Sequence, residues 1–144
     1  MEAHTDAQLL VLVGQRDELA LRELVERAIA VKIEVVTADL REYQRRGVDW
    51  LYFMSRNNLG AVLADDMGLG KTLQLLTLLA VEEAAGTKRG PTLIVAPTSV
   101  VGNWAREAAR FVPDMRVRVH HGTGRLKGDE LFEAADGTDI VITS

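Results

Sequence analysis

One glycine-rich stretch carries residue types that can hold phosphate: "DDMGLGKT", residues 65–72. Glycine tolerates backbone conformations that turn successive amide N–H groups toward one anion, so Gly68 and Gly70 predict a loop that curls around phosphate. Lys71 would add a positive charge for the β- and γ-phosphates, and Thr72 would supply a hydroxyl for Mg²⁺. The spacing therefore predicts a cradle for a nucleoside triphosphate and its metal ion.

The elements predicted on either side of the loop fit this chemistry. We expect a short apolar strand over residues 60–65, "GAVLAD", and a helix over residues 71–86 that Gly86 closes. Such a helix would point the positive end of its dipole at the phosphates. The alternative is a structural turn without a ligand, which the strand–loop–helix context disfavours. One position departs from the common pattern, because Asp65 stands where most such loops have glycine.

Strands and helices alternate in the rest of the chain. We expect strands over residues 92–97, 115–121 and 138–143, and helices over residues 100–112 and 124–135. The continuous apolar run "TLIVAP" at 92–97 is typical of a strand inside a parallel sheet. Repeated alternation of this kind predicts an α/β fold, with a parallel sheet and right-handed crossovers.

The part of the chain before the loop is predicted to be helical. Residues 17–31, "DELALRELVERAIAV", place apolar side chains on one helical stripe. We therefore divide the chain into an N-terminal helical segment, residues 1–38, and an α/β lobe, residues 39–144. The lead-in segment has no assigned function.

A second helix is predicted directly before the strand and the loop. It begins at Asp39, which forms a capping-box arrangement with Glu42, and it runs to about Asn57. Trp50 in this helix and Trp104 in a later one are candidates for stacking on nucleic-acid bases. Both lie on apolar stripes, so packing in the core is the favoured interpretation.

The composition excludes several classes of protein. The 144 residues are 47% hydrophobic and 26% charged, which is an ordinary globular balance. The absence of cysteine excludes disulfides and thiolate metal sites, and the three histidines lack zinc-site spacing. The acidic start lacks the features of a signal peptide, and no apolar run approaches the roughly 20 residues that span a bilayer. We expect no membrane partner and a cytoplasmic location, on the nucleoid in a bacterium or in the nucleus of a eukaryote.

The distribution of charge bears on nucleic-acid binding. The net charge of −4 disfavours such a partner, but residues 86–128 carry eight basic residues against two acidic ones. A basic section on an acidic chain can be the electrostatic footprint of phosphate contacts. A set of solvated surface faces is an equal alternative.

Several motifs, in the correct order, resemble those of the Swi/Snf-type helicase-like ATPases of superfamily two. Their first motif is typically Asp-Glu-Met-Gly-Leu-Gly-Lys-Thr, and this chain differs only by Asp66 in place of Glu. The family's Q motif is similar to "LREYQRRGVDWL", residues 40–51. Its motif Ia with the following Asn-Trp helix is similar to "LIVAPTSVVGNWAREAARF", residues 93–111, and the strand leading into its motif Ib is similar to "DIVITS", residues 139–144.

The resemblance implies a partial RecA-like P-loop lobe, a parallel sheet flanked by helices, with ATP and Mg²⁺ as cofactors. Gln44 would read the adenine edge, since a carboxamide offers both a donor and an acceptor. A surface glutamine is the alternative. Lys71 and Thr72 would be the catalytic candidates, with Thr72 also the Mg²⁺ ligand. The predicted ATP-binding loop residues are Asp65, Asp66, Met67, Gly68, Leu69, Gly70, Lys71 and Thr72.

The resemblance also implies duplex DNA and the remainder of a two-lobed motor as partners. Thr98 and Ser99 would touch the DNA backbone with hydroxyl and N–H groups. Capping of the following helix is the alternative for both, and the two roles are compatible. Thr143 and Ser144 would contribute to DNA binding in the same way.

ATP hydrolysis requires groups beyond the phosphate cradle. A carboxylate must hold Mg²⁺, and another group must orient or deprotonate the attacking water. In the resembled family an Asp-Glu pair after an apolar strand supplies both, and a second lobe supplies an arginine finger. No apolar strand predicted here ends in Asp-Glu, so we expect these groups beyond Ser144. The chain alone is expected to bind ATP weakly or not at all and not to hydrolyse it. We also expect poor solubility or partial disorder near residues 113–144.

Two other functions stay open at this point. A fragment of another superfamily-two motor, such as an RNA helicase, is disfavoured by "DDMGLGKT" and the Asn-Trp helix. A non-catalytic interaction module on a RecA-like scaffold is disfavoured by the intact glycines, lysine and threonine of the loop.

Overall fold

The computed structural model describes residues 36–87 and 90–144. The elements are α3 (Glu42–Arg56), α4 (Lys71–Ala84), β1 (Thr92–Val95), α5 (Thr98–Phe111), β2 (Val117–His120), the 3-10 turn η2 (Gly122–Gly124), α6 (Asp129–Ala135) and β3 (Ile140–Thr143). The helix predicted over residues 17–31 lies outside the described residues. Within the described ranges, no helix is both long enough and apolar enough to cross a membrane.

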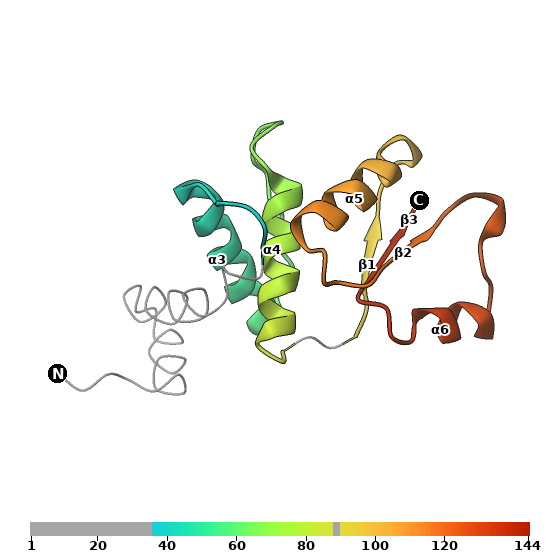
Figure 1. Ribbon diagram of the computed structural model, residues 1–144. Coiled ribbons are helices and arrows are strands. Elements are labelled where there is room, and N and C mark those ends of the chain that lie inside the picture. Colours follow the sequence, from blue (N-terminus) through green and yellow to red (C-terminus); the bar gives the residue numbers. More distant parts are fainter. Residues whose placement is uncertain (1–35, 88–89) are drawn as a thin grey trace.

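The strands of the described residues form one parallel sheet in the order β1-β3-β2. In the register of the middle strand, Ile140 lies opposite Thr92 on one side and Val117 on the other. Figure 1 shows α5 and α6 beside the strands, α4 next to α5, and α3 alongside α4 on the side away from the strands. The predicted α/β class with a parallel sheet is confirmed. Residues 113–144, expected to be partly disordered, instead supply β2, α6 and the middle strand.

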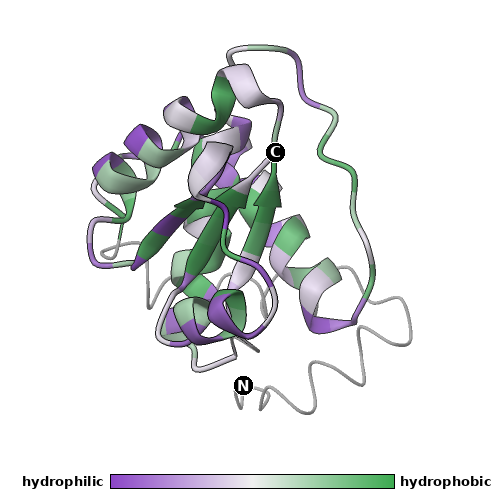
Figure 2. Ribbon diagram, turned by 90° about the vertical axis from the view of Figure 1, so that its right-hand side faces the viewer, coloured by the Kyte–Doolittle hydropathy of each residue, from purple (hydrophilic) through white to green (hydrophobic). Residues whose placement is uncertain are grey.

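The core lies between α4, α5 and the sheet. Ile140 and Ile142 of β3 are fully buried, and Figure 2 shows the strands as a mainly hydrophobic centre. α5 packs against β2, β3 and α4. Its inward positions recur at helical spacing as predicted, with Ala108 fully buried and Trp104 and Phe111 packed against the same cluster.

The predictions for two apolar segments of the sheet region are wrong. Residues 60–65 form no strand and run as an irregular segment between α3 and α4. A strand requires a hydrogen-bonded neighbour, and the described strands pair only with one another. β1 is an edge strand rather than an interior one, with Leu93 62% and Val95 70% exposed. An apolar run therefore indicates extended backbone here without fixing its place in the sheet.

The start of α3 also differs from the prediction. The helix begins at Glu42 with Arg41 as its N-cap, and Asp39 does not cap it. The backbone N–H of Arg41 donates to Oε1 of Gln44 at 2.9 Å, so a carboxamide inside the first turn takes the place of the predicted cap. Trp50 is 40% exposed, so its predicted packing in the core is wrong.

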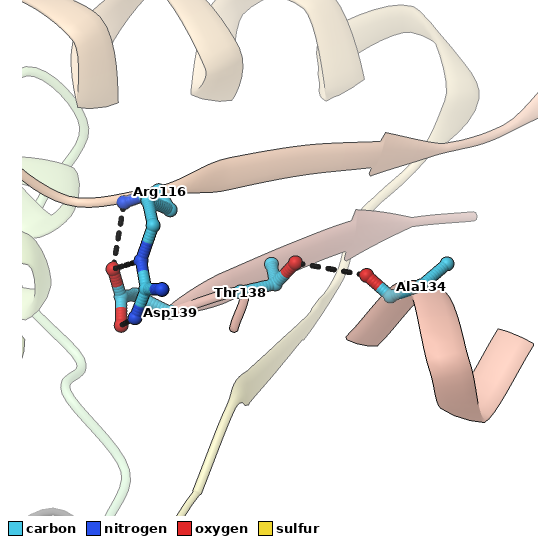
Figure 3. A network of polar contacts seen from close by, with 4 residues as sticks. All are labelled: Arg116, Ala134, Thr138 and Asp139. Atoms are coloured by element: carbon cyan, nitrogen blue, oxygen red, sulfur yellow. Dashed lines mark hydrogen bonds and ion pairs between the residues drawn. The ribbon is translucent and has the colours of Figure 1, made fainter. Parts of the chain in front are cut away.

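A polar network ties the beginnings of β2 and β3 together (Figure 3). The buried carboxylate of Asp139 accepts from the backbone N–H of Arg116 at 2.7 Å, and from Nε and Nη2 of the same residue at 3.1 and 3.2 Å. The hydrogen bond and the negative charge of Asp139 raise the pKa of Arg116. Next to this pair, the Thr138 hydroxyl donates to the carbonyl of Ala134 at 3.0 Å and fastens the end of α6. These contacts hold β2 in register with β3.

Candidate nucleotide-binding site

The glycine-rich loop leads directly into the N-terminus of α4. Gly68 and Gly70 have φ angles of 82° and 84°, in the left-handed region that residues with a side chain rarely adopt. Gly70 is the N-cap of α4, and Lys71 is its first residue. The first N–H groups of a helix have no intrahelical partner, so they and the positive end of the dipole are available to an anion. This local geometry is the one that binds phosphate at helix N-termini.

The side chain of Lys71 folds back onto the loop. Its Nζ donates to the backbone carbonyl of Asp65 at 2.6 Å and to that of Asp66 at 2.9 Å. The ammonium thus holds together the beginning of the loop and the beginning of the helix. Thr72 is half-buried in the first turn of α4, while Met67 is almost fully exposed at the tip of the loop.

Gln44 joins α3 to the end of the loop. Its side chain is buried, with Oε1 accepting from Arg41 and Nε2 donating to the backbone carbonyl of Leu69 at 3.2 Å. The alternative of a surface glutamine is therefore wrong. Its role toward adenine stays a prediction, but its position beside the loop is established.

The beginning of the loop has a partner that sequence reasoning missed. Gln74 of α4 is 0% exposed, and its Nε2 donates to Oδ2 of Asp65 at 3.0 Å. The signal was present in the sequence, because Gln74 is polar in the middle of the apolar run "LQLLTLLAV". Asp65, which stands where most such loops have glycine, is thus hydrogen-bonded to a buried side chain of α4.

Alanine substitutions at Gly68 and Gly70 provide a matched test of the loop. Both positions have positive φ, so either substitution is expected to cost about 1–2 kcal/mol of stability. Only at Gly70 would the added Cβ also meet a side chain, lying 2.4 Å from Nε2 of Gln44, whereas at Gly68 it meets nothing within 4 Å. We therefore expect Gly70→Ala to lower the urea midpoint more than Gly68→Ala. Equal midpoints would contradict the packing of Gln44 against the loop.

The predicted DNA-contacting residues gather at the carboxyl ends of β1 and β3. The backbone N–H of Ala96 donates to the carbonyl of Thr143 at 2.9 Å, which joins the two strand ends. Thr98 and Ser99 follow as exposed residues in the first turn of α5. The N-cap of α5 is Pro97 without a side-chain cap, so the capping alternative is wrong for both.

The last two residues have polar partners from β2 and the turn after it. The Thr143 hydroxyl donates to the carbonyl of His120 at 2.7 Å. Oγ of Ser144 lies 2.8 Å from Nδ1 of His121 and accepts from Nη2 of Arg125 at 2.8 Å. Ser144 therefore lies next to a cation, whereas the Thr143 hydroxyl is engaged within the sheet.

The chain matches the family model of the SNF2-related domain over residues 43–144. It is similar to YwqA of Bacillus subtilis (strain 168), with 47% identity over 105 residues that cover 73% of this chain and 11% of that protein. It is also similar to helicase SWR1 of Candida albicans, with 39% identity over 107 residues that cover 73% of this chain and 6% of that protein.

Solved structures agree with the sequence comparisons. The Sulfolobus solfataricus SWI2/SNF2 ATPase core in complex with dsDNA has a TM-score of 0.66 and 35% identity, over 76% of this chain and 22% of that one. The Sulfolobus solfataricus SWI2/SNF2 ATPase core domain has a TM-score of 0.64 and 35% identity, over 76% of this chain and 21% of that one. This chain thus spans less than a quarter of the solved cores and of the two relatives above. The predicted partial RecA-like lobe is confirmed, and the chain belongs to the family of SNF2-related domains.

Proposed function

We propose that the chain is the ATP-binding part of a DNA-dependent ATPase and DNA translocase of the SNF2 type. The observation that carries the proposal is the loop at the N-terminus of α4, with left-handed Gly68 and Gly70 and with Lys71 in the first turn. The free N–H groups and the ammonium would bind the β- and γ-phosphates of ATP. The hydroxyl of Thr72 would be the protein's ligand to Mg²⁺, which would neutralise phosphate charge.

Gln44 can contact adenine while it keeps its hydrogen bonds to Arg41 and Leu69. A carboxamide has two N–H donors and an oxygen with two lone pairs. The bonds to Leu69 and Arg41 use one donor and one lone pair. The second donor and the second lone pair remain for the edge of an adenine, which offers a complementary pair of atoms.

Duplex DNA is the proposed partner at the carboxyl ends of β1 and β3. Exposed hydroxyl and N–H groups at Thr98 and Ser99 can donate to phosphate oxygens. Arg125 places a positive charge beside Ser144. Support also comes from the similar Sulfolobus core, which was solved in complex with dsDNA.

We further propose that these 144 residues alone bind ATP weakly and do not hydrolyse it. Hydrolysis requires a carboxylate on Mg²⁺ and a group that orients the attacking water. The carboxylate of Asp65 already accepts from Gln74. The missing groups, together with an arginine finger, would come from the remainder of the motor.

The test is a calorimetric titration of the chain with Mg·ATP, followed by an assay of phosphate release with and without duplex DNA. Saturable binding without turnover is the expected result. Failure of the wild-type chain to bind Mg·ATP would overturn the nucleotide site. Turnover above the uncatalysed rate would overturn the claim that the hydrolytic groups lie elsewhere.

A further inference from the structure

We propose that Gln74 is a positioning residue of the nucleotide site, which sets the start of the phosphate-binding loop by holding Asp65. Gln44 holds the other end of the loop at Leu69. Two carboxamides from two helices, α3 and α4, would thus fix the loop at both ends. The effect on nucleotide affinity rests on the proposed function, while the effect on the shape of the loop does not.

Gln74 contacts Asp65 directly. Nε2 of Gln74 donates to Oδ2 of Asp65 at 3.0 Å, and the glutamine is completely buried. A bond to a carboxylate is charge-assisted and is stronger than a bond between neutral groups. Lys71 binds the backbone carbonyl of the same residue. Asp65 is therefore held through its side chain and through its main chain, both times from α4.

Packing alone does not account for a glutamine at position 74. Oε1 of Gln74 is buried and has no hydrogen-bond partner. A buried polar atom without a partner destabilises the fold, and the neighbouring buried positions Leu76, Leu78 and Leu79 are apolar. A leucine or methionine would fill the space without that cost. The amide group is therefore best explained by what Nε2 does at Asp65.

α3 leaves space for the side chain of Gln74 at Gly47. A Cβ built at Gly47 would lie 1.8 Å from Oε1 of Gln74, so the amide occupies the place where a side chain would begin. Gly47 lies three residues after Gln44, on the same face of α3. One short stretch of α3 therefore supplies Gln44 and contacts Gln74, the two side chains that hold the loop.

The contact with Gln74 depends on the unusual first residue of the loop, Asp65. A glycine at position 65 would offer no carboxylate to Gln74. With aspartate at this position, a side chain at the start of the loop is hydrogen-bonded to α4. The two glycines with left-handed backbone, Gly68 and Gly70, follow it in the sequence. A loop that is already held in its binding geometry loses less conformational freedom when phosphate binds, which favours affinity.

The experiment compares variants of the full chain by two measurements. One is the set of backbone amide NMR signals of residues 66–70 without nucleotide, and the other is the affinity for Mg·ATP by calorimetry. Gln74→Met removes the donor and keeps a similar volume. It is expected to shift or broaden the loop signals and to weaken Mg·ATP binding about tenfold or more, as loss of one charge-assisted bond implies. Gln74→Glu, which sets a carboxylate against Asp65, should do the same.

Rescue and control variants separate positioning from a general loss of stability. Asp65→Asn combined with Gln74→Glu exchanges donor and acceptor, so it should recover the loop signals and most of the affinity lost in Gln74→Glu alone. Thr77→Val is the matched control. It removes a buried polar group one turn along α4 whose hydroxyl donates only to Leu73 at 2.7 Å. We expect wild-type loop signals and affinity from it.

The outcomes distinguish the two proposals. Wild-type loop signals in Gln74→Met would overturn the positioning role, as would a double variant no better than Gln74→Glu. If Thr77→Val changed the loop signals and lowered the affinity as much as Gln74→Met, removal of any buried polar group from α4 would have this effect. That result would also overturn the positioning role of Gln74. If the wild-type chain binds no Mg·ATP but the loop signals follow the expected pattern, the proposed function fails and the positioning role stands.

Discussion

Replacing Lys71 by alanine is expected to weaken Mg·ATP binding by about 100-fold or more. A hydrogen bond to a charged group contributes about 1.5–3 kcal/mol, and each 1.4 kcal/mol is a factor of ten in affinity, so the loss of two such bonds to phosphate gives this magnitude. Some binding should remain, because the N–H groups of Gly70 and the first turn of α4 do not depend on the lysine. Titration calorimetry with Mg·ATP measures the effect directly.

Two features of the site sharpen the comparison. Lys71 also binds the carbonyls of Asp65 and Asp66, so its removal is expected to loosen the loop as well as remove a charge. Lys127→Ala is the matched control, because it deletes an exposed lysine outside the loop and should leave the affinity unchanged. Equal affinity in Lys71→Ala and wild type would mean that the phosphates do not bind at this loop.

Local patterns in the sequence predicted the features of the site that depend on local physics. Left-handed backbone at Gly68 and Gly70 follows from the absence of a Cβ, and the buried stripe of α5 follows from spacing at 3.6 residues. Both properties are set within a few residues of chain. The resemblance to the family could likewise be recognised from the sequence, because the motifs are short and follow one another in the family's order.

The features that the sequence did not predict depend on distant partners. Residues 60–65 have strand composition but lie beside no strand of the described sheet, and β1 is exposed because it is an edge. Gln74 was missed because its partner, Asp65, lies on the loop nine positions earlier, and the path of that loop decides whether the two side chains meet. Asp39 does not cap α3 because the helix begins later, at Glu42, where the side chain of Gln44 accepts from the N–H of Arg41 instead.

The largest expected loss of stability comes from the middle of the sheet. Ile142 is fully buried in β3, between Ile94 of β1 and Val119 of β2. Truncation of such a side chain to alanine removes apolar contacts and leaves a cavity that the packed strands cannot close, at a cost of about 2–5 kcal/mol. Folded domains are stable by only about 5–15 kcal/mol, so Ile142→Ala should greatly lower the urea midpoint.

Val95→Ala is the matched control, since it shortens a β-branched side chain on β1, at the edge of the same sheet, where it is 70% exposed. It is expected to change stability by about 0.5 kcal/mol or less. A cost at Val95 as large as that at Ile142 would contradict the placement of β1 at an exposed edge, because only a covered side chain loses that much on truncation. The ratio of the two costs therefore tests whether β3 is covered and this face of β1 is exposed, near the carboxyl ends of the two strands where DNA is proposed to bind, since Thr143 lies one residue after Ile142 on β3.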